Sequence, residues 1–461
     1  MRIDYKNGYY EGEVIEENVR HGYGVYYWHR GDKYEGQWYK GRPQGFGQRY
    51  HISGNTYEGE FFEGKPHGKG VFTWHNGDKY DGDFVEGRPE GKGIYYYEMG
   101  SIYEGEFVNG KQHGIGKITY PDGGRYEGEW FEDQRHGKGT YHYPDGGVYY
   151  GDWVEGKRTG FGIDNFSDGG KYEGEWLEDL WHGNGTLYYC DGGFYKGEWQ
   201  NGYENGYGTK EYLDKNIYEG QWKNGKREGK GILSSSNGLK CEGEWANDKL
   251  NGYGIINFSD GAKFEGMFVD DKRHGFGTMF YNDGARYEGE WRDNIRAGHG
   301  IMLFSNGAKY EGEWSEDLEN GEGTAHLCDG AFFEGDFVNG SFKFGTCYLS
   351  NGNRYVGEFD ESSNFHGKGT LYWFGGDRYE GDFEHGLISG NGKLYFANGV
   401  LYIGEFFGGQ MNGYGVMHFA DGTRYESNWN NGEPEGNGKL FDHDGNPCDG
   451  EITLTPRENK I

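Results

Sequence analysis

Histidine next to glycine is the first feature of this sequence that could do chemistry, because imidazole binds metals and transfers protons near neutral pH. The motif His-Gly-x-Gly occurs at His21, His67, His113, His136, His182, His274 and His366. Equivalent histidines of neighbouring copies would lie about 10 Å apart, too far to share one metal ion. Gln, Glu, Thr, Asn, Ala or Ser takes the same place in other copies. We therefore interpret the motif as a turn whose geometry glycine supplies. We nominate no metal ligand and leave open a metal held between molecules.

Paired carboxylates are the second candidate. Glu127 and Glu129 are spaced like the two acids of a glycosidase, but similar pairs recur along the whole chain. Many copies on an open face offer no unique environment that would separate two pKa values, so we expect no catalytic residue and no enzyme. Two interpretations of this acidic stripe stay open. It is either a solvated face with cross-strand ion pairs that limits aggregation, or a track for basic segments of partner proteins.

Phosphate binding has weak support in the sequence. The Gly-Lys pairs lack the following Ser or Thr of a nucleotide-binding loop, so no cofactor is predicted. One segment, "WKNGKREGKG", gathers four cations that form a candidate lipid site: Lys223, Lys226, Arg227 and Lys230. The net charge of -30 opposes an anionic membrane and a nucleic-acid backbone alike. We expect no nucleic-acid partner, and a phosphoinositide-binding membrane tether remains an alternative function.

A repeat of 23 residues positions all of these side chains. The pattern Tyr-x-Gly-x-aromatic begins at Tyr10, Tyr34, Tyr57, Tyr80, Tyr103, Tyr126, Tyr149, Tyr172, Tyr195, Tyr218, Cys241, Phe264, Tyr287, Tyr310, Phe333, Tyr355, Tyr379, Tyr402, Tyr425 and Cys448. Self-similarity at such a period indicates a repeat architecture. Regular spacing also explains how a chain with 33% hydrophobic residues but 18% aromatic residues can build a core.

Each repeat predicts one β-hairpin. In "RYEGEW", Tyr126, Gly128 and Trp130 alternate with charged residues, which is the period of a strand. A second strand is expected from Gly139 to Tyr143, after the turn containing Gly137, and an Asp-Gly pair closes the repeat. The central glycine is expected to leave room for a ring of the neighbouring hairpin. One hairpin cannot offset its own ordering entropy, so the hairpins must stack.

The segment "YEGEFFEGKPHGKG", residues 57–70, resembles the MORN repeat (membrane occupation and recognition nexus), and the resemblance extends over almost the whole chain. It implies an all-β fold, an elongated single-layer solenoid of about 19–20 stacked antiparallel hairpins that would extend about 190 Å if uncurved. We expect an N-terminal cap segment at 1–9, a continuous array at 10–451 and a C-terminal tail at 452–461. Proteins of this family act mostly as scaffolds in radial spokes, in basal cytoskeletal collars and at membrane junctions.

The resemblance implies a non-enzymatic scaffold for other proteins in a ciliary or cortical cytoskeletal assembly, and a regulatory scaffold for an enzyme on another chain is a further alternative. Self-association through the terminal repeats and side-by-side dimers both stay open, because exposed strand edges pair readily. The sequence shows no signal peptide and no membrane-length apolar run. Its cysteines are single, without a CxxC pair. Both observations favour the cytoplasm.

The repeat spacing changes only between the two strands of a hairpin. One residue is gained after Val14, one is lost in "VNGSFKFG" and one is gained in "DESSNFHG". Length changes in repeat proteins map to loops on one rim, often the binding rim. The segment 341–364 is therefore a candidate docking point or bend, against the alternative of harmless loop drift. Its candidate residues are Ser341, Phe342, Lys343, Phe344 and Asn364.

Overall fold

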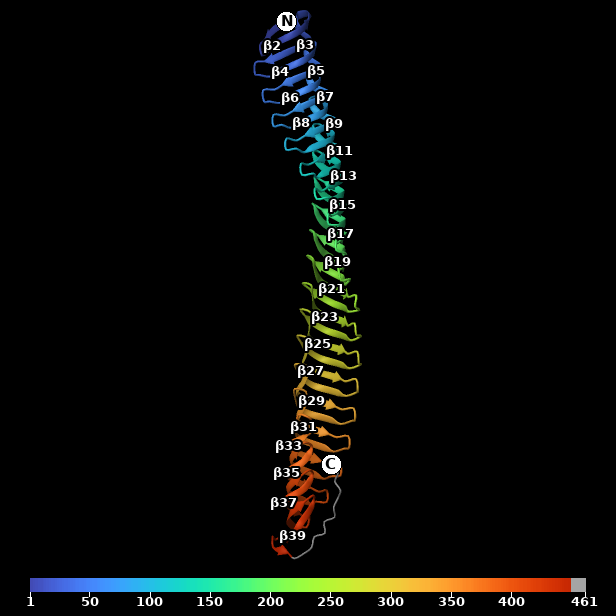
Figure 1. Ribbon diagram of the computed structural model, residues 1–461, viewed down its shortest axis with the longest axis vertical. Coiled ribbons are helices and arrows are strands. Elements are labelled where there is room, and N and C mark those ends of the chain that lie inside the picture. The colour runs from blue at the N-terminus through green and yellow to red at the C-terminus, as the bar shows by residue number, and fades with distance from the viewer. Residues whose placement is uncertain (449–461) are drawn as a thin grey trace. The chain divides into compact units, whose positions relative to one another are not determined.

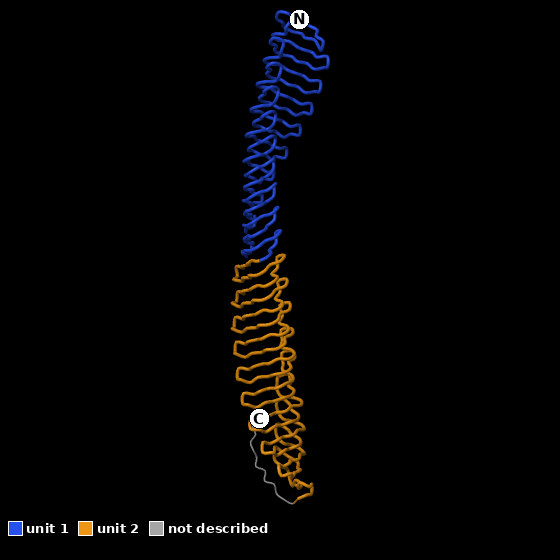
Figure 2. The backbone as a smooth tube through the Cα atoms, turned by 180° about the vertical axis from the view of Figure 1, so that it is seen from behind, with its two compact units in different colours: residues 1–229 blue, residues 230–461 orange. Residues whose placement is uncertain are grey.

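Antiparallel β-hairpins make up the chain throughout the described residues. The computed structural model describes residues 1–448 and divides into unit 1, Met1–Gly229, and unit 2, Lys230–Ile461 (Figure 2). The predicted tail at 452–461 lies outside the described residues. Besides strands, the first hairpin contains one short 3-10 turn, η1 (Glu16–Asn18), at the position where its connection has an extra residue.

The strands of unit 1 are β1 (Arg2–Tyr5), β2 (Gly8–Ile15), β3 (Val19–Trp28), β4 (Lys33–Tyr39), β5 (Arg42–Tyr50), β6 (Thr56–Phe62), β7 (Lys65–Thr73), β8 (Lys79–Val85), β9 (Arg88–Tyr96), β10 (Ile102–Val108), β11 (Lys111–Thr119), β12 (Arg125–Phe131), β13 (Gln134–His142), β14 (Val148–Val154), β15 (Lys157–Asn165), β16 (Lys171–Leu177), β17 (Leu180–Tyr188), β18 (Phe194–Gln200), β19 (Tyr203–Glu211) and β20 (Ile217–Lys223). The boundary between the units falls within β21 (Lys226–Ser234).

The strands of unit 2 are β22 (Lys240–Ala246), β23 (Lys249–Asn257), β24 (Lys263–Val269), β25 (Lys272–Phe280), β26 (Arg286–Arg292), β27 (Ile295–Leu303), β28 (Lys309–Ser315), β29 (Leu318–His326), β30 (Phe332–Val338), β31 (Ser341–Tyr348), β32 (Arg354–Phe359), β33 (Phe365–Tyr372), β34 (Arg378–Glu384), β35 (Leu387–Tyr395), β36 (Leu401–Phe407), β37 (Gln410–His418), β38 (Arg424–Asn430), β39 (Glu433–Phe441) and β40 (Pro447–Cys448).

Within each unit, strands pair antiparallel with their neighbours in sequence, as the order of labels in Figure 1 shows. In the hairpin β12–β13, Tyr126 faces Tyr141 and Gly128 faces Gly139. Gly139 then faces Gly151 of β14, so each glycine pair continues into the next hairpin. The predicted all-β fold of stacked hairpins is confirmed.

The second strand of the hairpin begins earlier than the sequence analysis predicts. β13 starts at Gln134, not Gly139, and includes the whole His-Gly-x-Gly motif, in which His136 faces Glu129. The register shifts between Gly128 and Glu129, so the motif is a β-bulge in a strand and the turn interpretation is wrong. Gly137 has φ +57°, which a bulge tolerates best in glycine.

The true hairpin turn is the two-residue connection before this strand. Glu132 and Asp133 have φ +46° and +68°, and two central residues with positive φ match the strand twist of a hairpin. The Asp-Gly pair lies in the longer loop between hairpins, where Gly146 has φ +100° and Tyr143 N donates to Gly147 O over 2.9 Å. Glycine suits this position because it adopts a positive φ without steric cost.

The core of each unit is a row of aromatic rings in which each tyrosine packs between the aromatic ring of its own strand and that of the next hairpin. Tyr126 is completely buried, with ring centroids 5.4 Å from Trp130 of its own strand and 5.2 Å from Trp153 of the next hairpin. Both contacts are edge-to-face, the favoured geometry for aromatic pairs. The row thus joins consecutive hairpins, as expected from the repeat.

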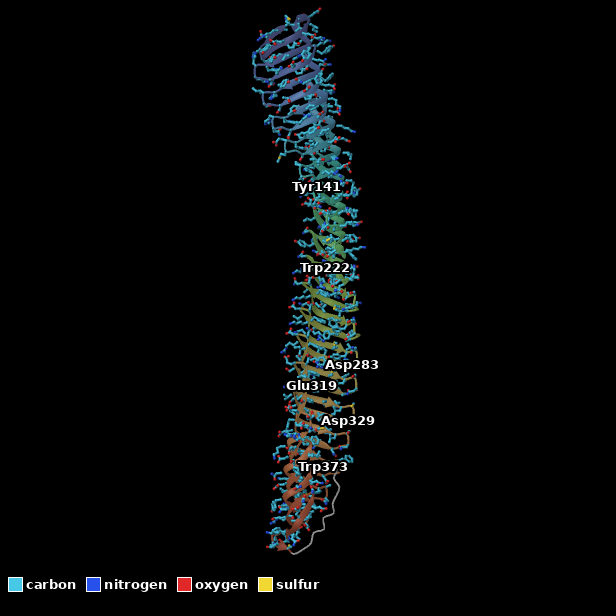
Figure 3. The ribbon with its side chains drawn as sticks, in the orientation of Figure 1. Tyr141, Trp222, Asp283, Glu319, Asp329 and Trp373 are labelled. Atoms are coloured by element: carbon cyan, nitrogen blue, oxygen red, sulfur yellow. The ribbon has the colours of Figure 1, made fainter. Side chains whose placement is uncertain are left out.

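The tyrosine of the same hairpin covers the glycine pair, and the expected ring of the neighbouring hairpin contacts the backbone only at the edge of the pair. A Cβ added to Gly139 would lie 2.3 Å from the ring of Tyr126, and one added to Gly128 would lie 2.5 Å from Gly139 Cα. The Tyr126 hydroxyl crosses the pair and donates to Glu129 O over 2.9 Å. The indole of the next hairpin instead reaches the backbone edge. Trp222, labelled in Figure 3, donates from Nε1 to Gly208 O over 3.1 Å.

Candidate binding surface

Arginine at the second residue of the second strand fastens neighbouring hairpins together. The guanidinium lies 4.1 to 4.3 Å from the centroid of the next hairpin's tryptophan at Arg20, Arg135, Arg158, Arg273 and Arg296. Arg296 also donates from Nη2 to Asp317 O over 2.6 Å and from Nε to Asp317 Oδ1 over 3.1 Å. Cation–π contact and charged hydrogen bonds thus act on one partly buried group. This position is structural.

We expect Arg296→Ala to lower the free energy of opening its hairpins by about 2 kcal/mol, because the guanidinium's ring contact and hydrogen bonds are lost together. The loss of stability in Arg296→Lys should lie between those of the wild-type and Arg296→Ala proteins, since an ammonium keeps the charge but lacks the planar geometry of the guanidinium. Exposed Arg292 is the matched control, and its replacement by alanine should cost about 0.5 kcal/mol or less. Amide hydrogen exchange of β26–β29 measures these effects. Equal protection in the Arg296→Ala and Arg292→Ala proteins would contradict the assignment.

The face opposite the rings carries the acidic stripe, and part of that stripe is structural. In several hairpins the carboxylate after the central glycine accepts a backbone N–H from the bulge. Lys138 N donates to Glu129 Oε1 and Tyr207 N donates to Glu198 Oε1, both over 2.9 Å. A carboxylate that precedes the central glycine forms an ion pair with a cation two residues earlier on the same strand, as Glu173 does with Lys171 over 2.8 Å. These pairs are exposed and contribute little stability.

The same face also exposes a row of large apolar side chains that the sequence analysis did not identify. They occupy the residue before the second glycine of the bulge motif and are 50% to 60% exposed. Lys, Asn, His or Glu holds this position in the other hairpins. We call this set the apolar row, and it comprises Tyr23, Phe46, Ile115, Phe161 and Tyr207 in unit 1 and Tyr253, Phe276, Phe344 and Tyr414 in unit 2. The signal was present in the sequence, because bulge residues at this position point away from the tyrosine face.

Carboxylates lie directly beside the apolar row. Phe46 faces Glu60, Phe161 faces Glu175 and Phe276 faces Glu290 across the strand pairs. At Tyr23, Tyr207 and Tyr414 the hydroxyl donates to a carboxylate. Tyr207 donates to Glu219 Oε1 over 2.9 Å, and this hydrogen bond raises the pKa of Tyr207. Each unit therefore presents rings flanked by negative charge, which suits ligands that are both apolar and cationic.

The predicted docking segment divides between core and surface. Phe342 is 3% exposed and packs 5.0 Å from Phe337 and 4.7 Å from Phe359, measured between ring centroids, so it belongs to the core. Phe344 is exposed and belongs to the apolar row. Ser341 and Lys343 are half-buried within β31, and exposed Asn364 lies in the loop before β33. A docking role or bend for this segment stays a prediction.

The predicted lipid cluster includes Arg227, which contacts a core ring. Arg227 lies 5.6 Å from the ring centroid of Tyr218, at the repeat position of the fastening arginines described above. Lys223, Lys226 and Lys230 are exposed, Lys223 and Lys226 in unit 1 and Lys230 in unit 2. Lipid binding by this cluster stays a prediction.

One cluster of potential metal ligands lies at the longer connection after β32. Asp360, His366 and His385 place their ligand atoms within 4.8 Å of one another. The backbone N–H of Asn364 lowers the pKa of Asp360 to about 2, so this carboxylate is ionised at neutral pH. Sequence reasoning missed the group because it compared only histidines at the same repeat position, whereas His385 occupies a hairpin turn.

A family model for the MORN repeat matches eighteen segments of the chain. The matches cover residues 10–33, 34–56, 57–79, 80–102, 103–125, 126–148, 149–171, 172–194, 195–216, 218–240, 241–263, 264–286, 287–309, 310–332, 355–378, 379–400, 402–424 and 425–446. They leave out residues 333–354, which contain the hairpin β30–β31 with its shortened connection.

Solved structures show only weak likeness to the chain. The SAS-4 TCP domain of Drosophila melanogaster, in complex with a proline-rich motif of Ana2, is 14% identical, with a TM-score of 0.20, and the match covers 42% of this chain and 82% of that one. The TCP10 domain of CPAP from Danio rerio is 10% identical, with a TM-score of 0.21 and coverage of 48% and 93%. TM-scores this low support no argument about function. No curated protein matches the chain. Among residues 1–448, no helical segment has the length and hydrophobicity of a membrane span.

Proposed function

Because this chain belongs to the family of MORN-repeat proteins, we propose that it is a non-enzymatic scaffold that binds basic segments of other proteins on its apolar row. The observation that carries this proposal is the repeated exposure of large rings, such as Phe46, Phe161 and Phe276, beside glutamates. Exposed apolar side chains in a repeated line are characteristic of interaction surfaces. Flanking carboxylates favour partners that carry Lys or Arg.

The cellular setting follows from the resemblance alone. Family members in radial spokes and basal cytoskeletal collars support a role in a cytoplasmic ciliary or cortical assembly. We further propose self-association through terminal hairpins, because strand edges at the end of an array offer unpaired backbone groups. Both proposals are separate from the binding chemistry of the apolar row.

A peptide titration tests the binding proposal. We expect the full chain to bind a synthetic peptide of alternating arginine and leucine saturably, and a peptide of alternating glutamate and leucine not at all. Replacing Phe46, Phe161 and Phe276 together with serine should weaken binding about tenfold or more, measured by fluorescence anisotropy. Serine at Met99 and Phe374, which are each 83% exposed but outside the row, is the control and should leave affinity unchanged.

Two results would overturn the proposal: binding that survives the triple replacement, or equal binding of the acidic peptide. Vesicles containing phosphoinositide form the second arm. Sedimentation with these vesicles that is lost after Lys223, Lys226 and Lys230 are replaced by glutamate would instead support the membrane tether. Arg227 is left unchanged in that variant because its ring contact would confuse lipid binding with folding.

A further inference from the structure

We propose that Asp360, His366 and His385 bind one divalent transition-metal ion, with Zn²⁺ as the best match. Their ligand atoms all lie within 4.8 Å of one another, and His385 Nδ1 is 3.3 Å from Asp360 Oδ2. The rings of His366 and His385 have centroids 5.7 Å apart. Among residues 1–448, no other three ligands of these types gather as closely.

The altered connection of this hairpin creates the cluster. β32 ends at Phe359, and the extra residue in the following loop leaves Asp360 at its start. His366 is the second residue of β33, which pairs with β34. His385 directly follows β34, in a turn where its φ is +48°. Two adjacent hairpins thus supply the ligands.

The turn at His385 carries a different charge pair from several other turns. Elsewhere a lysine of one hairpin pairs with an acidic turn residue of the next, as in Lys65–Glu86 at 2.7 Å and Lys111–Glu132 at 3.2 Å. Here the earlier hairpin provides the carboxylate of Asp360, and the later one provides the imidazole of His385. A carboxylate and an imidazole, both of which can bind a metal ion, thus lie together at this rim.

Hydrogen bonds from the loop orient the Asp360 carboxylate and leave its Oδ2 facing His385. Its Oδ1 accepts the backbone N–H groups of Ser362 and Asn364, each over 2.9 Å. Its Oδ2 faces His385 and accepts Asn364 Nδ2 over 3.2 Å. The carboxylate side chain is 16% exposed, so the loop orients it before any ion arrives. Ligands fixed in advance lose less entropy on binding.

The geometry fits a tetrahedral ion after a small side-chain movement. With metal–ligand bonds of about 2.1 Å, two ligands of a tetrahedral ion lie about 3.4 Å apart. The Asp360–His385 edge already measures 3.3 Å, and the His366 nitrogen need approach by about 1.4 Å at most, given the 4.8 Å limit. Two imidazoles and one carboxylate suit Zn²⁺ and neighbouring metals better than Mg²⁺ or Ca²⁺. Three protein ligands leave a fourth position for water or for a partner's side chain.

Isothermal titration of the metal-free full chain with Zn²⁺ tests the site. We expect one saturable site that Mg²⁺ does not occupy, and a tetrahedral absorption spectrum with Co²⁺. His385→Ala should reduce Zn²⁺ affinity about tenfold or more, and Asp360→Asn should act in the same direction. The side chain of His385 is 74% exposed, so its loss tests the site without disturbing the core.

His182→Ala is the matched control. His182 occupies the same repeat position as His366, and both have a buried Nδ1 without a hydrogen-bond partner. Its removal should leave Zn²⁺ affinity and stoichiometry unchanged. Absence of Zn²⁺ binding by the wild-type chain, or wild-type affinity in the His385→Ala protein, would overturn the proposal. Peptide binding by the apolar row is measured separately, so the two proposals fail independently.

Discussion

Gly139→Ala is expected to destabilise its hairpins by about 3 kcal/mol, a large effect for one methyl group. The added Cβ would lie 2.3 Å from the Tyr126 ring, a contact that real structures do not contain. Tyr126 cannot move aside, because it is fully buried between Trp130 and Trp153. Either the ring leaves the core or the strands separate, and the cost combines overpacking with lost edge-to-face contacts.

Gly375→Ala is the matched control for this prediction. A Cβ at Gly375 meets nothing within 4 Å, and this residue does not have a positive φ. Its replacement should change stability by about 0.5 kcal/mol or less. Amide hydrogen exchange of β12–β14, compared with the exchange around Gly375, separates the two. Similar small losses of protection at both sites would show that the glycine pair is not tightly packed.

One hairpin already contains a side chain at the central glycine and shows the structural cost. Ser427 replaces that glycine, and the ring of Tyr425 there is 9% exposed, with its centroid 6.2 Å from Trp429. In the hairpin of Tyr126 the corresponding values are 0% and 5.4 Å. Ser427 Oγ donates to Asn428 O over 2.9 Å, the carbonyl that the tyrosine hydroxyl reaches in other hairpins. A side chain is thus accommodated only where tyrosine is displaced and its hydrogen bond is replaced.

Trp153→Ala should cost about 4 kcal/mol and divide the unfolding of unit 1 into separate transitions. The indole is 3% exposed, contacts the rings of Tyr126 and Tyr149, and donates to Gly139 O over 3.3 Å. Arg135 would also lose the ring over which it lies. Large-to-small core changes cost several kcal/mol, and in a repeat array a broken interface uncouples its two sides.

Trp153→Phe is the appropriate comparison, because other hairpins use phenylalanine here, including Phe61, Phe84 and Phe107. Phenylalanine keeps the edge-to-face contacts and loses only the indole hydrogen bond, so we expect a cost near 1 kcal/mol and a single transition. Differential scanning calorimetry distinguishes the outcomes. Identical thermograms for the alanine and phenylalanine variants would mean that this ring does not couple the hairpins.

The repeat period, the tyrosine strand and the identity of the buried rings could be read from the sequence, because alternation and spacing follow directly from strand geometry. The second strand begins earlier than the sequence predicts. Glycine suggests a turn, whereas backbone pairing continues the strand through Gly137 as a bulge. Which ring covers the glycine pair depends on the direction in which the Tyr126 side chain extends along its strand. Spacing alone does not contain that direction.

The candidate sites were harder to predict than the repeat period and the buried rings. The apolar row arises because the bulge residue of one hairpin lies opposite a carboxylate of the next, as Phe161 does with Glu175. The metal cluster requires residues at different repeat positions, Asp360 and His385, to meet across neighbouring hairpins. Comparing equivalent repeat positions does not find the metal cluster, since it joins unlike positions of successive hairpins, whereas the apolar row occupies a single repeat position and could be found in this way.

The order of hairpins within a unit also determines how the chain would respond to tension. Among residues 1–448, strands pair with their neighbours in sequence, so the ladders between hairpins are loaded in series when the ends of a unit are pulled apart. A hairpin at an end of the array has one neighbour, so we expect it to open first and to release the length of one 23-residue repeat while the remaining rings stay packed. Each unit is therefore expected to lengthen in discrete steps, and when the tension falls the opened hairpins can refold one at a time against the hairpins that remain folded.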